Sequence, residues 1–391
     1  MNYLFYFFLL SCILLTALFF FLEFIPRMIS LYQHRFKKNK IQKNHFSDIE
    51  KMIFNASLSM AKSDKVTMVW EDPNHSFIEK LITLFRKKNS YSDEFKKYNY
   101  PRAFLLLGII SYLIKKNEKK ALYDFQILFD KYITPEGKPS FKLNRVDQTP
   151  FGEVALKLYI IYKEKKYIRF ADQIYSYLVR NIDPADGTIN YRPEIKVILN
   201  DTIGMTIPFL LQYAKITKNQ DAIKIAEQQI DYFLKYGVDN FTHLPVHGIN
   251  KKTRTKIGSA NWGRGIGWYY LGLSNCAKNN LHYMSYVKNL DKSLHQLKNK
   301  QELWSQFPGS SEKFDASSTL MIIYSTMSNN PTYLTKNEFL NLILLYLSEK
   351  GAILQTSGDT ISLNEYSKTF GLSELSQGFL LLLLTKLKDR D

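Results

Sequence analysis

The sequence is poor in cysteine and lacks the common metal and nucleotide motifs. Two cysteines among 391 residues cannot form a disulfide framework. Cys12 lies in an apolar run and Cys276 in an expected helix, so we expect both to be unbonded. The chain has no His-Glu-x-x-His helix, no cysteine–histidine cluster with zinc spacing and no glycine-rich loop ending in Gly-Lys-Ser/Thr. These absences argue against a zinc site and a phosphate-loop nucleotide site.

Acidic residues are scarce relative to basic ones. Asp and Glu together number 36 against 53 Lys and Arg, which gives a formal charge of +17. A basic protein attracts nucleic acid, an anionic membrane surface or an acidic sugar polymer. No recognised nucleic-acid motif accompanies the charge, so nucleic acid is the least favoured partner. The 45% hydrophobic and 15% aromatic content indicates a globular chain of one large or two ordinary domains.

Charge is absent from the N-terminal run between Tyr3 and Leu22. About 20 apolar residues span a bilayer as a helix. The run has no basic start and no small-residue cleavage site, both of which a signal peptide would have. We therefore expect residues 1–25 to be an uncleaved single-pass anchor and residues 26–45 a basic juxtamembrane tether. The positive-inside rule then predicts a cytoplasmic body, with a periplasmic body as the alternative.

The rest of the chain, 46–391, is expected to be one all-α domain. Helical patterns at 46–63 and 75–89 precede a repeat of about 50–60 residues, in which a strongly apolar helix is followed by an amphipathic one. The apolar helices are expected to begin near Pro101, Pro150, Asp201, Trp262, Phe314 and Ser373. Such hairpins predict a six-hairpin α/α barrel, a closed toroid, with an open solenoid as the alternative. Long irregular stretches at 183–200, 238–261 and 300–313 favour closure.

Acidic and aromatic residues recur where the apolar helices begin. Asp201 lies in the stretch LNDTIGM, Asp147 precedes the Pro150 helix, Trp262 and Arg264 start another, and Asp315 a further one. Taken singly, each Asp is explained as a helix N-cap and each Trp as packing. In a toroid, however, these helix starts converge on one mouth, where positive helix ends favour anions. Asp201 is then either a capping residue or a proton donor at that mouth.

These residues resemble the motifs of glycoside hydrolase families 88 and 105, the unsaturated glucuronyl and rhamnogalacturonyl hydrolases. The resemblance runs over about 98–325, through Tyr98-Asn-Tyr100-Pro, NDTIGMTIPFLL, LPVHGIN, NWGRGIGW and Phe314-Asp-Ala-Ser-Ser318. The tryptophan element is the most specific of them. The resemblance implies a six-hairpin barrel, no cofactor and an acidic oligosaccharide substrate.

The resemblance also implies a reaction and a role for each residue. The substrate would carry a terminal uronic acid with a C4–C5 double bond, which is hydrated with one acid/base residue instead of the usual glycosidase pair. Asp201 would be that acid/base and Asp147 its partner carboxylate. Tyr100, His247, Trp262, Arg264 and Trp268 would bind the sugar, with the guanidinium suited to an acidic group.

Three positions depart from the family pattern, and they keep other functions open. Ile249 and Asn250 follow the His-Gly pair, where an aromatic residue and an acid are usual, and Ile266 replaces an Asn between the glycines of the tryptophan element. One alternative is a different α/α-barrel glycosidase or lyase acting on surface polysaccharide, which the anchor fits. Another is a non-catalytic, membrane-anchored glycan-binding protein.

Overall fold

The computed structural model describes residues 2–25, 45–64, 66, 97–192, 196–311, 313–360 and 362–387. The helix expected at 75–89 and nearly all of the expected tether lie outside these residues. All the other expected helices are present, with boundaries within a few residues of those predicted.

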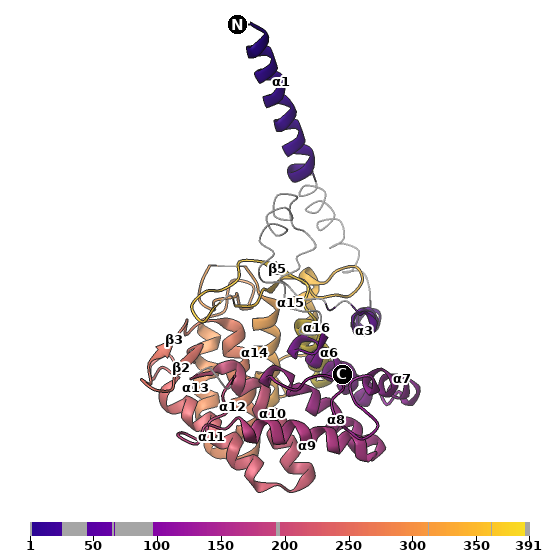
Figure 1. The fold of residues 1–391 in the computed structure, drawn as a ribbon, viewed down its shortest axis with the longest axis vertical. Helices are drawn as coiled ribbons and strands as arrows, with labels where there is room; N and C mark the ends of the chain where they lie inside the picture. The colour runs from indigo at the N-terminus through magenta and orange to yellow at the C-terminus, as the bar shows by residue number, and fades with distance from the viewer. Residues whose placement is uncertain are drawn as a thin grey trace.

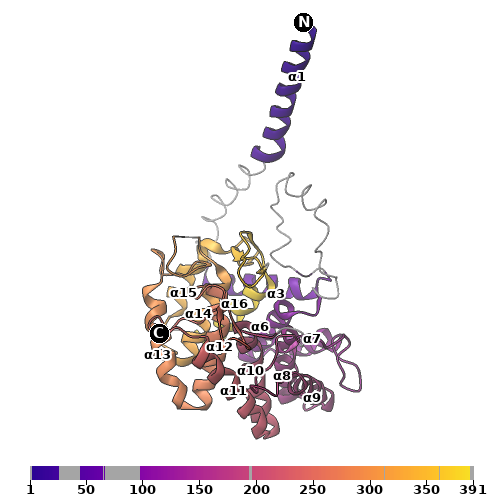
Figure 2. The ribbon, with the colours of Figure 1, turned by 60° about the vertical axis from the view of Figure 1, so that its left-hand side comes forward.

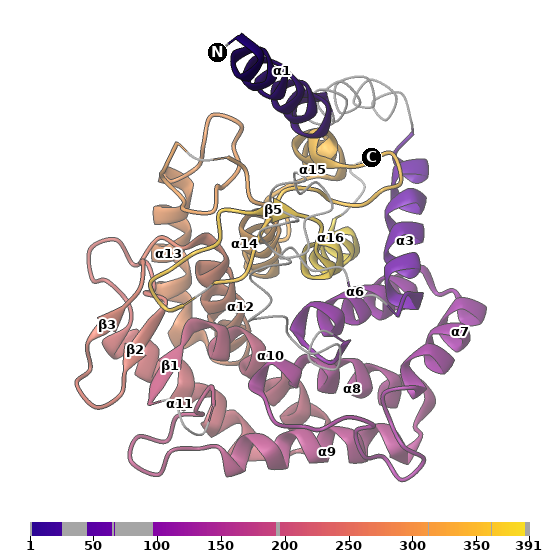
Figure 3. The same cartoon turned by 45° about the horizontal axis from the view of Figure 1, so that its top comes forward.

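Six strongly apolar helices form the inner layer of the fold. Each packs against the next in chain order, and the last packs back against the first, so the ring is closed (Figure 3). This closure confirms an α/α-barrel type of fold and rules out the open solenoid. These helices are buried on nearly all sides, because the outer layer covers one face and the opposite face lines the ring. They are α6 (Tyr100–Lys116), α8 (Pro150–Tyr162), α10 (Asn200–Thr217), α12 (Gly263–Asn279), α14 (Ala316–Asn329) and α16 (Glu374–Lys386).

Amphipathic helices form the outer layer (Figure 3). In α9, for example, the buried residues Tyr167, Phe170, Ala171, Ile174 and Tyr177 recur at intervals of three or four and face the inner helices. The layer consists of α3 (Phe46–Lys62), α7 (Lys119–Asp130), α9 (Lys165–Arg180), α11 (Gln220–Tyr236), α13 (Met284–Gln296) and the short α15 (Lys336–Ile343).

A buried ion pair joins α6 to α16 where the ring closes. The Arg102 guanidinium donates to both Glu374 carboxylate oxygens, at 2.7 and 2.8 Å, and the two residues are 2% and 0% exposed. Arg102 also donates to the backbone carbonyls of Ala61 and Ser63, at and just beyond the end of α3. Further along the two helices, Gly108 and Gly378 approach so closely that a Cβ on either would clash with the other helix's backbone. The glycines and the ion pair together fix the closing contact.

Two small antiparallel sheets occupy the irregular connections. β1 (Val197–Leu199), β2 (Gly248–Asn250) and β3 (Lys256–Ile257) pair in that order, with Leu199 opposite Gly248. β4 (Thr356–Ser357) pairs with β5 (Phe370–Gly371). Because β1 leads directly into α10, its pairing with β2 brings the residue before β2, His247, to the start of that helix. The Asn200 amide donates to the His247 carbonyl at 3.0 Å.

The N-terminal helix α1 (Asn2–Phe19) continues into a short π-helical segment, η1 (Phe20–Phe24). The span Tyr3–Phe24 has a mean hydropathy of 2.5 and is long and apolar enough to cross a membrane. Figures 1 and 2 draw α1 away from the ring, and its apolar side chains are exposed. A signal sequence has the same length and composition.

Candidate active site

Asp201 lies in the first turn of α10 but does not cap it, so of its two interpretations the capping one is wrong. The chain enters the helix from β1, and Leu199 holds the extended backbone of an N-cap with no capping side chain. Asp201 is therefore the second helical residue, and its side chain is free to point elsewhere. It is 16% exposed, and within the described chain its Oδ2 atom has no hydrogen-bond partner. An unsatisfied carboxylate oxygen at a helix start is placed to receive a ligand.

His247 is an ionisable neighbour of Asp201. Its Nε2 lies 3.6 Å from Asp201 Oδ2, and its Nδ1 lies 3.1 Å from the Leu363 carbonyl oxygen. A carbonyl can only accept, so we assign the proton of the neutral ring to Nδ1. Nε2 is then left facing Asp201. The ring also packs against Trp262, with centroids 4.5 Å apart.

Asp147 is buried close to the same helix start. It lies in a 3-10 turn, η3 (Val146–Gln148), which packs against α10, and it is 2% exposed. Burial raises the pKa of Asp147 to about 6; a hydrogen bond from Tyr191 opposes this shift, and the negative charge of Asp201 adds to it. The two carboxyl groups paired in the sequence analysis are thus close enough for the charge of Asp201 to act on Asp147.

Arg264 and Trp262 belong to the start of α12. The buried Arg264 guanidinium lies over the Trp262 ring at 5.6 Å and donates to the Gly358 carbonyl. Gly265 lies directly against the Trp262 ring and the side-chain amide of Asn200, and a Cβ there would clash with both. The glycine in the tryptophan element is therefore required for the close packing of α12 on the start of α10.

Asp359 is a third carboxyl group of the site, and the sequence analysis missed it. Its Oδ1 accepts a hydrogen bond from the Tyr100 hydroxyl at 2.5 Å and lies 3.6 Å from Arg264 Nη1. Burial raises the pKa of Asp359, and the charge of Arg264 opposes this shift. The residue lies in a loop just after β4. A search for acids at helix starts could not find it.

The loop that carries Asp359 also covers part of the site. We call residues 358–360 and 362–369 the strap; in Figure 3 it is the yellow segment that leads to β5. Tyr366 of the strap packs 5.5 Å from Trp262 and 5.8 Å from His247, and its hydroxyl accepts from the Ser259 amide at 2.8 Å. The strap thus shields the histidine and the tryptophan from solvent.

Asp315 and Trp268, both considered in the sequence analysis, hold the surrounding structure together. Asp315 caps α14, and its carboxylate accepts from the Ser317 amide and hydroxyl and from the Ser318 and Ser357 hydroxyls. The capping explanation is therefore right for Asp315. Trp268 is 1% exposed and packs beneath Tyr100, with ring centroids 5.7 Å apart. It supports the floor of the site from below.

The three departures from the family pattern do not open onto the site. Ile249 and Ile266 are fully buried in the hydrophobic core. The Asn250 side chain accepts from the Lys252 and Thr253 amides and so stabilises the turn between β2 and β3. Within the described residues there is no group of three or more His, Cys, Asp or Glu side chains that could hold a metal ion.

A closed ring of helical hairpins, with carboxyl groups gathered where its inner helices begin, defines an α/α-barrel glycosidase. The sequence profile of Glycosyl Hydrolase Family 88 matches residues 75–345, and the chain belongs to this family. A comparison with curated protein sequences gave no significant match.

Solved structures share the fold at low sequence identity. A possible family 105 member from Klebsiella pneumoniae has a TM-score of 0.70 at 14% identity, over 88% of this chain and 93% of that one. A family 105 glycoside hydrolase from C. acetobutylicum has a TM-score of 0.64 at 16% identity, over 78% and 96%. A structure of UGL with dGlcA-Glc-Rha-Glc has a TM-score of 0.63 at 13% identity, over 85% and 94%.

Proposed function

We propose that this enzyme removes unsaturated uronyl residues from the ends of oligosaccharides by hydrating their C4–C5 double bond. The observation that carries the proposal is the Asp201 carboxyl group at the mouth, whose Oδ2 atom has no hydrogen-bond partner in the described chain and lies 3.6 Å from His247 Nε2. The family assignment and the similarity to the UGL complex support it.

In this reaction Asp201 acts twice. As an acid it protonates C4 of the vinyl ether, and the ring oxygen stabilises the positive charge that develops at C5. The Asp201 carboxylate then takes a proton from water while the water oxygen bonds to C5. The resulting hemiketal opens and expels the remainder of the sugar chain, so one residue suffices where other glycosidases use two.

Arg264 and Tyr100 are the groups that would bind the sugar carboxylate. A guanidinium binds a carboxylate with two parallel hydrogen bonds, and the phenol adds another donor. His247 and Trp262 would contact the sugar ring, and Asp147 its hydroxyl groups.

Asp359 gives a prediction about affinity. Its carboxylate competes with an acidic substrate for Arg264 and Tyr100, so Asp359→Asn is expected to lower KM for an unsaturated uronyl substrate. Removing a like charge near 4 Å in water is worth about 1 kcal/mol, which corresponds to about a fivefold change. Steady-state kinetics of the two proteins would measure it. A higher KM would show instead that Asp359 itself binds the sugar.

The same residue favours a second candidate function. Because Asp359 compensates the charge of Arg264, the site could accept a neutral sugar, as in a different α/α-barrel glycosidase of surface polysaccharide. The detergent-solubilised full chain should be incubated with lyase-generated uronyl oligosaccharides and with neutral oligosaccharides. Loss of the double-bond absorbance supports the first function. Release of reducing sugar from the neutral set alone would replace it with the second.

We also propose that residues 1–25 remain as a membrane anchor with the body in the cytoplasm. The apolar span lacks a cleavage site, and basic residues follow it. Membrane fractionation with N-terminal sequencing is expected to find the intact N-terminus in the membrane, and spheroplast proteolysis to leave the body uncut. A soluble protein that starts beyond residue 25 would identify a signal sequence.

A further inference from the structure

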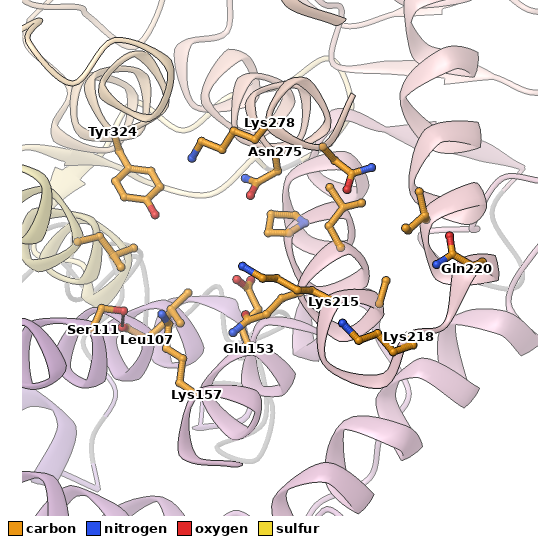
Figure 4. A pocket seen from close by; sticks show the side chains of 17 residues that line it. Leu107, Ser111, Glu153, Lys157, Lys215, Lys218, Gln220, Asn275, Lys278 and Tyr324 are labelled. Carbon is orange, nitrogen blue, oxygen red and sulfur yellow. Dashed lines mark hydrogen bonds between the residues drawn. The ribbon is translucent and has the colours of Figure 1, made fainter. Parts of the chain in front are cut away.

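A second cavity lies at the other end of the barrel, where the inner helices finish. Its volume is about 640 Å³, which is within the range of small-molecule sites. Its walls come from the later parts of α6, α10, α12 and α16, together with α8 and α14 (Figure 4). None of the proposed sugar-binding or acid/base residues lines it.

Aromatic rings separate this cavity from the active site. Phe104 and Phe379 border its deepest part. Phe104 packs against Trp268 at 5.2 Å, and Trp268 in turn packs beneath Tyr100. A ligand in the cavity therefore could not touch Asp201.

The cavity is strongly basic. Lys157 of α8, Lys215 and Lys218 of α10, and Lys278 of α12 extend around it, and Glu153 is the single acidic residue in its lining (Figure 4). Across the described chain, none of these lysines forms an ion pair within 4.0 Å. A fifth lysine, Lys386, lies 4.7 Å from the ring centroid of the lining residue Tyr324.

The lysines are close enough to repel one another. Burial lowers the pKa of Lys386 to about 8, and the positive charges of Lys278 and Lys157 add to the effect. Burial also lowers the pKa of Lys278 and of Lys157. Clustered ammonium groups of this kind destabilise the empty cavity and favour a bound anion.

Helix ends explain only part of the cluster. Cations near a helix C-terminus are stabilised by its free carbonyl groups, and this accounts for Lys215, Lys218 and Lys278. It does not account for Lys157, which lies five residues before the end of α8.

Glu153 is the second observation that points to an anion site. It lines the cavity and is 8% exposed, yet its Oε1 has no hydrogen-bond partner in the part of the chain that the structure describes. Leaving a buried carboxyl oxygen unsatisfied costs free energy. When protonated, this carboxyl group could donate a hydrogen bond to an anion.

We propose that this cavity binds a small molecule with two or more negative charges, carried by carboxylate or phosphate groups, at a site separate from the active site. The four lysines bind the charges from several sides, and Glu153 lies at the inner wall. Carboxylates would make the ligand an oligouronate, and phosphates a phosphorylated metabolite.

Isothermal titration of the full chain in detergent, at low ionic strength, tests the proposal with inorganic pyrophosphate and trigalacturonate as probes. At least one probe should bind the wild type, and Lys157→Met/Lys278→Met should raise its Kd at least about tenfold. Lys252→Met, on the exposed turn between β2 and β3, is the matched control and should bind like the wild type. The probe that loses affinity identifies the anion class.

Two results would overturn the anion site. One is no binding of either probe at millimolar concentration. The other is equal affinity in the wild type and in the lysine double variant, which for trigalacturonate would indicate binding at the active site instead. If the double variant fails to fold, the exposed Lys215→Met variant replaces it, with an expected rise in Kd of about threefold and an unchanged melting temperature.

The pH dependence gives an independent check. Burial raises the pKa of Glu153 to about 7, so its carboxylate forms through neutral pH and then repels an anion. Between about pH 6 and 8 the wild type should lose affinity relative to Glu153→Gln, a comparison in which any titration of the probe cancels. The positive charge that acts directly on Glu153 is that of Lys157, which opposes the rise in its pKa; the other charged groups at the cavity are Lys215, Lys218 and Lys278 in its lining and Lys386 beside it. Among them Lys386 loses its proton near pH 8, so both proteins should weaken above that pH. The same fall in Glu153→Gln would exclude Glu153 from the site.

Discussion

Replacing Asp201 with asparagine is expected to lower turnover at least about a hundredfold and leave the protein folded. The amide has the same shape but cannot give a carboxylic proton to C4, and general acid–base catalysis contributes about 10²–10⁴-fold. Asp201 forms no capping bond, so apart from its contact with His247 the variant loses the interaction of its charge with the helix dipole, which is worth about 0.3–1 kcal/mol. Loss of the double-bond absorbance measures turnover, and thermal melting measures stability.

Asp221→Asn is the matched control for this experiment. Asp221 is also the second residue of its helix, α11, but it lies on the outer layer and pairs with Lys224 in solvent. It should retain wild-type turnover. If a folded Asp201→Asn protein also turns over substrate at a near-normal rate, Asp201 is not the proton donor and the proposed reaction loses its main support.

Breaking the buried ion pair between α6 and α16 should have the largest effect on stability. Arg102→Met leaves the Glu374 carboxylate buried without its guanidinium, and removal of one partner of a buried pair costs about 3–5 kcal/mol. The loss should be visible as a lower midpoint in denaturant unfolding. Lys224→Met, which removes the exposed pair with Asp221, should change the midpoint little.

A double variant separates the charge from the packing. Arg102→Met/Glu374→Met removes both charges, so it should recover much of the stability that Arg102→Met loses. If Arg102→Met is as stable as the Lys224→Met control, the ring closes through helix packing alone and the ion pair contributes nothing measurable.

The hairpin order could be predicted from the sequence because each inner helix is buried on nearly all sides and each outer helix on one. This difference appears directly as a uniformly apolar segment followed by a periodic one, as in α8 and α9. Ring closure was less predictable, because it depends on the contact between α6 and α16, which lie far apart in the chain. The long connections in the sequence favoured closure but could not show that contact.

Without the family resemblance, the active site was predictable only where its residues occur at helix starts. Asp147, Asp201 and Arg264 share that position, and the structure brings them to one mouth. The alternative interpretation of Asp201 as a capping residue was wrong because a three-residue strand, too short to show a periodic pattern, leads into a helix that begins at Asn200. Asp359 could not be predicted in this way because it lies in a loop, outside any helical pattern. It reaches Tyr100 and Arg264 only through the folded conformation of the strap.

The aromatic side chains beneath Tyr100 close the bottom of the active site, so the barrel has no open channel along its axis. With Phe104, Trp268 and Phe379 in mutual contact below the carboxyl groups, a polysaccharide chain cannot thread through the ring. In the proposed reaction only a chain terminus would therefore reach Asp201, and the released monosaccharide would leave through the same opening.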